Sequence, residues 1–446
     1  MSAQAVKNVD RSRIGFLQAV AMAVGTMIGA SIFSVFGVGA RIARQNLPEA
    51  FLLSGALALI VGYSYAKLGP HIISNAGPIA FILKGIGDNL VTGALSVLLW
   101  LTYVVSVAMF ARGFAGYFLP LVGLPETAVG TAALVVGVVA LFTVLNFFGS
   151  RAVGKAEFWI VLVKLGILGV FIAAGMVRIA PSRIVPSLDA SHLGGMLHAG
   201  VLFFLSYMGF GLITNIGENL RDAKRTIPRA IYTSIGIALV VYVLVAVVAV
   251  GNLPTDRLVE VGENALAVAA EPFLGSFGFV LISIGALFSI SSAMNATLYG
   301  GANIAYALAK DGELPELFER KVWFGSAEGL YITAALAVAF ALLFDMNGIA
   351  SITSSVVTVI YIFVLVAHHR LADEVGGNRV ALVVNLVVLV AVFAALLYFQ
   401  YREDPMILVG TVVVLAAAVA VESVYRYWRK REFRTRKLGV DTGPQG

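Results

Sequence analysis

The sequence predicts an all-α integral membrane protein, and three observations carry that prediction. Of the 446 residues, 59% are hydrophobic and only 13% are charged, and the mean hydropathy is +0.92. The apolar residues gather in long runs of about 20 residues or more, the length that a helix needs to cross a bilayer. Lys and Arg are distributed unequally between alternate connecting segments, as the positive-inside rule describes. A soluble globular domain does not have this composition.

Twelve apolar runs are long enough to form spans. They cover residues 14–43, 49–71, 91–119, 129–148, 154–178, 194–217, 228–250, 276–309, 329–345, 349–369, 379–400 and 405–427. The first run follows Lys7, Arg11 and Arg13, as the apolar region of a signal peptide would. It is too long for such a region and no clear cleavage site follows it, so we expect a retained span. The twelve spans leave no room for a soluble domain.

Basic residues indicate how the spans are oriented. With both termini in the cytoplasm, most of the 31 Lys and Arg residues fall in inner segments, as the positive-inside rule predicts. The outer segments hold Arg41, Arg44, Arg178, Arg183, Arg257 and Arg402. We therefore expect a multi-pass protein of the cell membrane. The net charge of +6 reflects this topology and does not indicate nucleic-acid binding, because the basic residues are spread over many loops.

Two spans carry glycines where a membrane helix is normally regular. The first reads VGTMIGASIF over residues 24–33, with Gly25 and Gly29 inside it, and the sixth reads SYMGFG over residues 206–211, around Gly209. Glycine inside a helix costs roughly 0.5–1 kcal/mol relative to alanine. Unwound backbone at membrane depth is tolerated where it lines a cavity. We therefore predict that helices 1 and 6 are discontinuous.

The positions of the two breaks predict an internal repeat. Gly25 and Gly209 are 184 residues apart, and nearly the same distance separates the start of the third span at 91 from the start of the eighth at 276. Five spans in one unit invert the next unit, so we expect a five-plus-five inverted repeat. The predicted organisation is a cytoplasmic N-terminus 1–13, a first repeat 14–178, a second repeat 194–369, two extra C-terminal helices 379–427 and a basic cytoplasmic tail 428–446.

A break in the first span would create a binding site for a zwitterion. Unwinding frees the backbone N–H groups of Gly29, Ala30 and Ser31 at the positive end of a half-helix, which suits a carboxylate. The carbonyls from Gly25 to Met27 end the preceding half-helix and suit an ammonium group. Alternatively, Gly25 and Gly29 form a small-xxx-small packing motif. The second break, in span six, favours the binding site.

Lys164 lies near the middle of the fifth span, in FWIVLVKLGILGVF, residues 158–171. Insertion scales put the free-energy cost of a central lysine at about 2.5–3.5 kcal/mol. Removal from water disfavours the charged form of an amine, so we predict a proton carrier that stands in for a bound cation. The alternative is a fixed structural ammonium hydrogen-bonded to carbonyls.

Other candidate chemistry is weaker. Ser289, Ser292 and Asn295 of the eighth span offer oxygens to an ammonium, although helix packing accounts for most such residues. His368 and His369 stand at a helix end without acidic or cysteine residues at metal-ligand spacing. We expect no metal, no cofactor and no enzymatic activity.

Three blocks of sequence resemble the amino acid–polyamine–organocation (APC) superfamily. They are GTMIGASIF at 25–33, GENLRDAKRTIPRAI at 217–231 and AYALAKDGELPELF at 305–318. The resemblance covers most of the chain and implies amino acid transport on a five-plus-five inverted-repeat, LeuT-like fold. The segments SYMGFG, VLVKLGILG and FSISSAMNAT further resemble a proton-coupled, broad-specificity subgroup. In that subgroup a lysine of helix five takes the place of a sodium ion, which implies that Lys164 carries the coupling proton beside the Gly25 carbonyl and the Ser289 hydroxyl.

The same resemblance assigns the substrate contacts. The substrate carboxylate is expected at the backbone of Gly29, Ala30 and Ser31. Its amine is expected at the carbonyls of Met27, Leu205 and Met208. Side-chain contacts are expected from residues around the Gly209 break and from the third span, namely Phe204, Leu205, Tyr207, Met208 and Tyr103.

Two departures from the superfamily pattern narrow the predicted function. Many relatives have Gly-x-Gly at the first break, whereas in this chain Ser31 stands in place of the second glycine. Many relatives also have a glutamate in the sixth helix, at the position that Gly211 occupies here. The missing carboxylate argues against an arginine or polyamine exchanger and leaves Lys164 as the main coupling candidate.

We predict a proton-coupled importer of mainly neutral L-amino acids that works by alternating access. Its expected partners are the amino acid, protons and membrane lipids, and a monomer is expected to suffice for transport. The alternatives are an amino acid exchanger with Lys164 as a fixed cation, and a non-transporting amino-acid sensor on the same fold.

Overall fold

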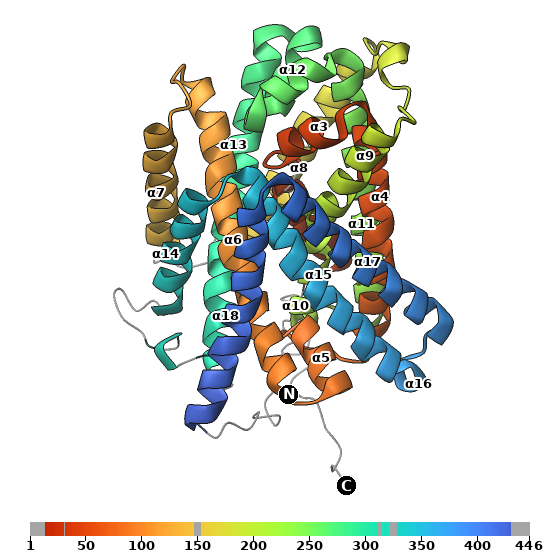
Figure 1. The fold of residues 1–446 in the computed structure, drawn as a ribbon, viewed down its shortest axis with the longest axis vertical. Coiled ribbons are helices and arrows are strands. Elements are labelled where there is room, and N and C mark those ends of the chain that lie inside the picture. The colour runs from red at the N-terminus through yellow and green to blue at the C-terminus, as the bar shows by residue number, and fades with distance from the viewer. Residues whose placement is uncertain are drawn as a thin grey trace, which may run out of the picture.

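The computed structural model describes residues 14–30, 32–146, 153–310, 314, 316–318, 320 and 328–429. Most of these residues are helical. They form no strand, and the β-type pairing among them is a single isolated bridge between Ile14 and Leu220. The helices run mostly along the long axis of the molecule (Figure 1). The predicted all-α class is confirmed.

The helix bounds agree closely with the predicted spans. Among the described residues, ten helices are long and apolar enough to cross a membrane, and the apolar segments Phe16–Gly29 and Glu328–Leu343 are shorter. The helices are α2 (Phe16–Ala30), α3 (Phe36–Ala43), α4 (Leu47–Leu68), α6 (Leu90–Leu121), α7 (Ala128–Leu145), α8 (Val153–Met176), α9 (Ala190–Leu202), α11 (Ala223–Asn252), α13 (Ala265–Lys310), α14 (Glu328–Leu343), α15 (Met346–Arg370), α17 (Arg379–Glu403) and α18 (Pro405–Arg429).

Polar caps fix where several of these helices begin. The Asn89 side chain accepts hydrogen bonds from the first-turn N–H groups of α6, and Asn378 does so for α17. Thr127 and Asp345 cap α7 and α15 in the same way. Each cap satisfies backbone donors that have no partner inside the helix. These four helices therefore begin within a few residues of the predicted span starts at 91, 129, 349 and 379.

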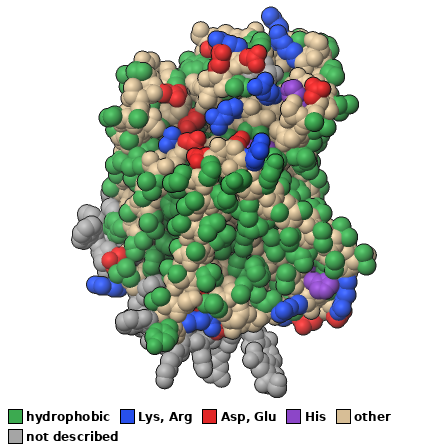
Figure 2. Space-filling view, in the orientation of Figure 1, with side chains coloured by type: hydrophobic (Ala, Val, Ile, Leu, Met, Phe, Trp, Pro, Cys, Tyr) green, Lys and Arg blue, Asp and Glu red, His purple; other side chains and the backbone are tan. Residues whose placement is uncertain are grey.

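The bundle has a central helix and an apolar belt. Helix α6 packs against α7, α13, α14, α15 and α18, and 89% of its most apolar window is buried. In the space-filling view, charged side chains gather toward the two ends and a broad hydrophobic band lies between them (Figure 2). Such a band matches the hydrocarbon layer of a bilayer.

Several short helices lie outside the predicted spans, among them α5 (Pro78–Ile86), α12 (Thr255–Glu260) and α16 (Ala372–Val375). Helix α5 lies at the lower end of the molecule in Figure 1, and α12 lies at the upper end. All three are too short to be recognised as spans. Helix α13 begins earlier than predicted, but Gly275 kinks it with a φ of 61°, next to the predicted start of the eighth span at 276.

Both predicted discontinuities are present, but the first lies later than expected. Helix α2 remains regular through Gly25 and Gly29, ends at Ala30, and is followed by a turn over residues 32–35 before α3. The glycines of the first span therefore do not unwind it. The sixth span is broken where predicted, because η5 (Phe203–Gly211), a nine-residue 3₁₀ segment, separates α9 from α10 (Leu212–Asn215). Segments of 3₁₀ helix are rarely longer than four residues and often mark a hinge.

The predicted repeats, 14–178 and 194–369, stay a prediction. The predicted N-terminal segment 1–13 and residues 430–446 of the predicted tail lie outside the described residues.

Close packing of α3 against η5 predicts a clear difference between two glycine variants. A Cβ on Gly39 would lie 1.8 Å from Cζ of Phe203, whose ring stacks on Phe51. A Cβ on Gly137 of α7 would meet nothing within 4 Å. We expect Gly39→Val to destabilise the protein by about 1–3 kcal/mol through overpacking, seen as a melting temperature several degrees lower in detergent.

Gly137→Val is the matched control, since it places the same side chain in a helix without a steric conflict. Equal melting temperatures for the two variants would contradict the described contact between α3 and η5.

Candidate functional site

The two discontinuous helices pack directly against each other. A Cβ on Gly209 of η5 would lie 2.9 Å from the Ala23 carbonyl oxygen and 3.0 Å from the Met27 backbone nitrogen, both in α2. Met27 is fully buried. The absence of a side chain at Gly209 thus allows the backbone of η5 to touch α2.

Lys164 lies at the junction of α2, α8 and α13. Its side chain is buried, with a relative exposure of 2%. Its Nζ donates a hydrogen bond to the Gly25 carbonyl oxygen at 3.3 Å. Lys164 therefore links α8 to α2 in the interior of the bundle, where a buried amine needs acceptors.

Gly29 brings α13 to the same junction. A Cβ on Gly29 would lie 3.0 Å from the Ala293 Cβ, 3.2 Å from the Ser289 carbonyl oxygen and 3.4 Å from Lys164 Nζ. Gly29 thus allows α2 and α13 to pack closely, which was the alternative to an anion-binding site on its backbone.

The predicted neighbours of Lys164 are placed as follows. The Gly25 carbonyl accepts the hydrogen bond that was expected. The Ser289 hydroxyl does not, because its Oγ has no hydrogen-bond partner among the described residues. The backbone carbonyl of Ser289, and not its side chain, lies next to Gly29 and therefore near the Lys164 amine.

A cavity of about 140 Å³ lies beside the break in η5. Its walls come from α2, α4, α6, α13, α15, η5 and α10, and include Thr26, Tyr65, Tyr103, Ser106, Met208, Gly209, Asn215, Thr297 and Tyr361. Pro78 of α5 lines it as well. Helices α5 and α10 both lie toward the lower end of the molecule in Figure 1. The cavity therefore extends from the break toward that end of the molecule. It is smaller than the roughly 300–1,000 Å³ of typical ligand pockets, so it suits a small solute.

Three predicted substrate residues line this cavity, namely Tyr103, Met208 and Gly209. Gly29, which packs on α13, is not among its lining residues. Ala30 ends α2, and Ser31 lies outside the described residues. Since α2 is helical through Ala30, the expected anion site on free N–H groups of Gly29 and Ala30 is wrong for this state.

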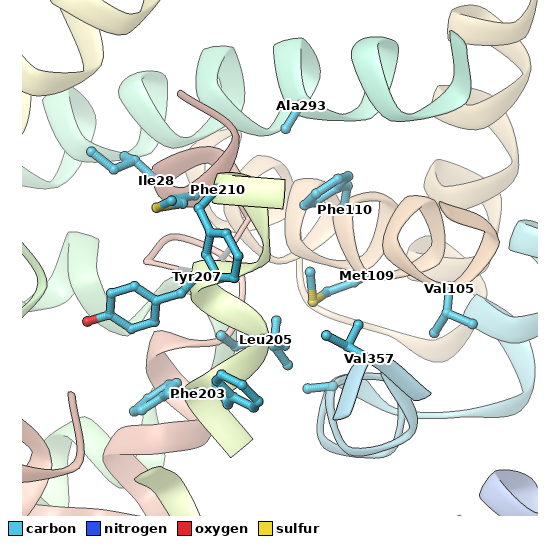
Figure 3. Close-up of a cluster of buried hydrophobic side chains, with 14 of the residues drawn as sticks. Ile28, Val105, Met109, Phe110, Phe203, Leu205, Tyr207, Phe210, Ala293 and Val357 are labelled. Carbon is cyan, nitrogen blue, oxygen red and sulfur yellow. The ribbon is translucent and has the colours of Figure 1, made fainter. Parts of the chain in front are cut away.

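Four further predicted contact residues, Met27, Phe204, Leu205 and Tyr207, are fully buried away from the cavity. The Tyr207 hydroxyl donates to the Phe51 carbonyl at 3.3 Å, and its ring packs on Tyr242. In Figure 3, Tyr207 points away from α6, whereas Leu205 lies on the side of Met109 and Val357. The tight turn of the 3₁₀ segment distributes these side chains around its axis, so they cannot all face one cavity.

The sequence analysis missed Ser106 and Asn215. Asn215 Nδ2 donates to the Tyr103 hydroxyl at 3.2 Å, which joins α10 to α6 at the cavity wall. Ser106 lies three residues after Tyr103 and therefore on the same face of α6. This helical spacing from Tyr103 is the signal that finds Ser106, whereas Asn215 has no such signal because α10 has only four residues.

The described residues contain no group of three His, Cys, Asp or Glu side chains that could hold a metal ion. The cavity lining includes hydroxyl groups, an amide, aromatic rings and aliphatic groups. Such a lining binds a small neutral or zwitterionic solute through hydrogen bonds and apolar contact.

Comparison with known proteins identifies the class. The amino acid permease family matches residues 14–421, so the chain belongs to this family and, with it, to the APC superfamily. It is a multi-pass membrane transporter and not an enzyme.

Individual relatives cover nearly the whole chain. It is 60% identical to protein MJ0609 of Methanocaldococcus jannaschii, over 95% of this chain and 98% of that protein. It is 31% identical to the inner membrane transport protein YbaT of Escherichia coli, over 94% and 97% of the two chains. The branched-chain amino acid permease BcaP of Bacillus subtilis is 23% identical over 68% of each chain.

The cavity geometry predicts which residues of η5 can be reached by a water-soluble reagent. The natural chain has no cysteine, so single-cysteine variants can be compared directly. We expect Met208→Cys to react with a cationic methanethiosulfonate reagent several-fold faster than Leu205→Cys, because Met208 lines the cavity and Leu205 is fully buried. Equal rates, or a faster reaction at position 205, would contradict this placement of η5.

Proposed function

We propose that this protein imports neutral L-amino acids in symport with protons, by alternating access, with Lys164 as the proton-carrying residue. The single observation that supports this proposal best is the hydrogen bond from buried Lys164 Nζ to the Gly25 carbonyl. It places a titratable group between the first broken helix and its neighbours, where a change of charge affects how α2 is held.

The relatives support an amino acid as the substrate. One is named a branched-chain amino acid permease, and another is named an inner membrane transport protein. The lining of the cavity supports a neutral side chain, because the described residues that form it include no Asp, Glu, Lys or Arg. A charged substrate side chain would find no opposite charge there and would lose its hydration.

The coupling step follows from the contacts of Lys164. A protonated amine attracts the Gly25 carbonyl and holds α2 against α8. Loss of the proton removes the positive charge and weakens this link. The protonation state would then shift the balance between inward-open and outward-open states, since a ligand shifts an equilibrium by its difference in affinity for the two states.

The cavity supports the proposed direction of opening. It extends toward the end of the molecule where α5 and α10 lie. With the expected orientation, both termini and these helices are cytoplasmic and the protein lies in the cell membrane. The described state would then be one in which the cavity leads inward, and a monomer would suffice for transport.

An exchanger is the second candidate, and the tight packing around Lys164 favours it. The amine lies close to both Gly25 and Gly29 with almost no exposure, as a fixed structural cation would. In an exchanger the charge never leaves Lys164, and only the substrate changes the balance of states. A non-transporting sensor would bind the amino acid at the same cavity without flux.

Uptake of labelled alanine into proteoliposomes separates these candidates. We expect an inward-directed proton gradient to stimulate uptake by the natural protein. Lys164→Ala should lose this stimulation while alanine still raises the melting temperature of the purified variant, because the lysine is not part of the cavity wall.

Lys164→Arg is the matched variant, since it keeps a positive charge that cannot be lost at accessible pH. Gradient-driven uptake by Lys164→Ala would contradict the proton-carrier role. Gradient-independent exchange that survives in Lys164→Arg would favour the exchanger, and binding without flux would favour the sensor.

A further inference from the structure

Ser106 is a buried polar residue of the cavity wall whose hydroxyl has no partner. Its relative exposure is 3%, it lines the cavity, and its Oγ makes no hydrogen bond among the described residues. A hydroxyl in a helix can be satisfied by bonding back to a carbonyl one turn earlier, and Ser106 makes no such bond. The neighbouring Thr102 makes one to the Leu99 carbonyl at 2.6 Å.

Another hydroxyl of the same wall differs from Ser106 in this respect. Thr26 of α2 donates to the Met22 carbonyl at 2.9 Å, so its proton is already used. Ser106 retains both its donor and its acceptor capacity. A buried group of this kind is expected to be satisfied by water or by a ligand in the cavity.

Tyr103 provides a second hydroxyl one turn away on α6. Its oxygen accepts a hydrogen bond from Asn215 Nδ2 at 3.2 Å. That bond fixes the position of the hydroxyl and leaves its proton to be donated elsewhere. Residues three apart on a helix lie side by side, so Tyr103 and Ser106 lie on one face of α6, and both line the cavity.

The groups around this pair are uncharged. The remaining lining residues named for the cavity are aromatic, aliphatic, amide or hydroxyl residues. A hydroxyl in the substrate side chain can accept from Tyr103 and exchange a hydrogen bond with Ser106. An apolar side chain of the same shape would expel water from Ser106 and leave it unpartnered, and such sites discriminate strongly against the analogue that lacks the polar group.

We propose that Ser106 and the Tyr103 hydroxyl form a subsite that recognises a side-chain hydroxyl in the transported amino acid. The subsite favours threonine over valine, which has nearly the same shape. This inference rests on the proposed amino acid transport and specifies the substrate class within it.

Ligand-induced thermal stabilisation of the purified protein tests the subsite without requiring transport. Titration with threonine and with valine gives an apparent Kd for each. We expect the natural protein to bind threonine about tenfold more tightly than valine, and Ser106→Ala to bring the two values within about twofold of each other. Tyr103→Phe is a second variant that removes only a hydroxyl and should reduce the same ratio.

Ser96→Ala is the matched control on the same helix. Ser96 is buried, but its Oγ donates to the Thr92 carbonyl at 3.1 Å and it does not line the cavity. The ratio of the Kd for valine to the Kd for threonine should therefore be the same in Ser96→Ala as in the natural protein. The subsite proposal would be overturned if Ser106→Ala left the ratio of the Kd for valine to the Kd for threonine unchanged. It would also be overturned if threonine did not stabilise the natural protein. Failure of gradient-driven alanine uptake with an intact threonine preference would overturn the coupling mechanism and leave the subsite standing.

Discussion

The burial of one lysine amine is the constraint on which the packing of α2, α8 and α13 depends. Lys164 has 2% relative exposure, and a polar group removed from water must be compensated by polar contacts. The Gly25 carbonyl supplies one such contact. Helix α13 can approach because Gly29 has no side chain, and its backbone at Ser289 lies against that glycine. The requirement to satisfy one amine therefore brings together α2, α8 and α13, which are far apart in the sequence.

The broken helices and the cavity follow from this junction. Helix α2 is held on one side by Lys164 and on the other by η5, where Gly209 allows direct backbone contact. The 3₁₀ segment leaves a small cavity between η5 and the central helix α6. The Lys164 junction lies on α2, α8 and α13, and the cavity is lined in part by α6 and α10. One helix, α2, contacts both regions, since Thr26 lines the cavity, and in the proposed mechanism α2 would couple them.

The sequence was sufficient for features that depend on local pattern. Long apolar runs predicted the helices, and the glycines around Gly209 predicted the second break. Features that depend on distant contacts were missed or misplaced. Gly25 and Gly29 resemble a break, but α2 stays helical through both. Gly29 allows the close approach of α13, and the Gly25 carbonyl accepts a hydrogen bond from Lys164 of α8. Arg112 of α6 donates to the carbonyls of Ala341 and Phe344, and no sequence pattern joins these residues.

The central claim is that the proton that accompanies the substrate is carried on Lys164. The most direct test is the pH inside proteoliposomes, followed with a trapped fluorescent indicator after alanine is added outside, without any imposed gradient. The account predicts that alanine acidifies the lumen in the presence of the natural protein, and that with Lys164→Ala alanine still enters while the lumen pH stays constant. Acidification of equal extent with Lys164→Ala would contradict the account, because the proton would then travel on another group.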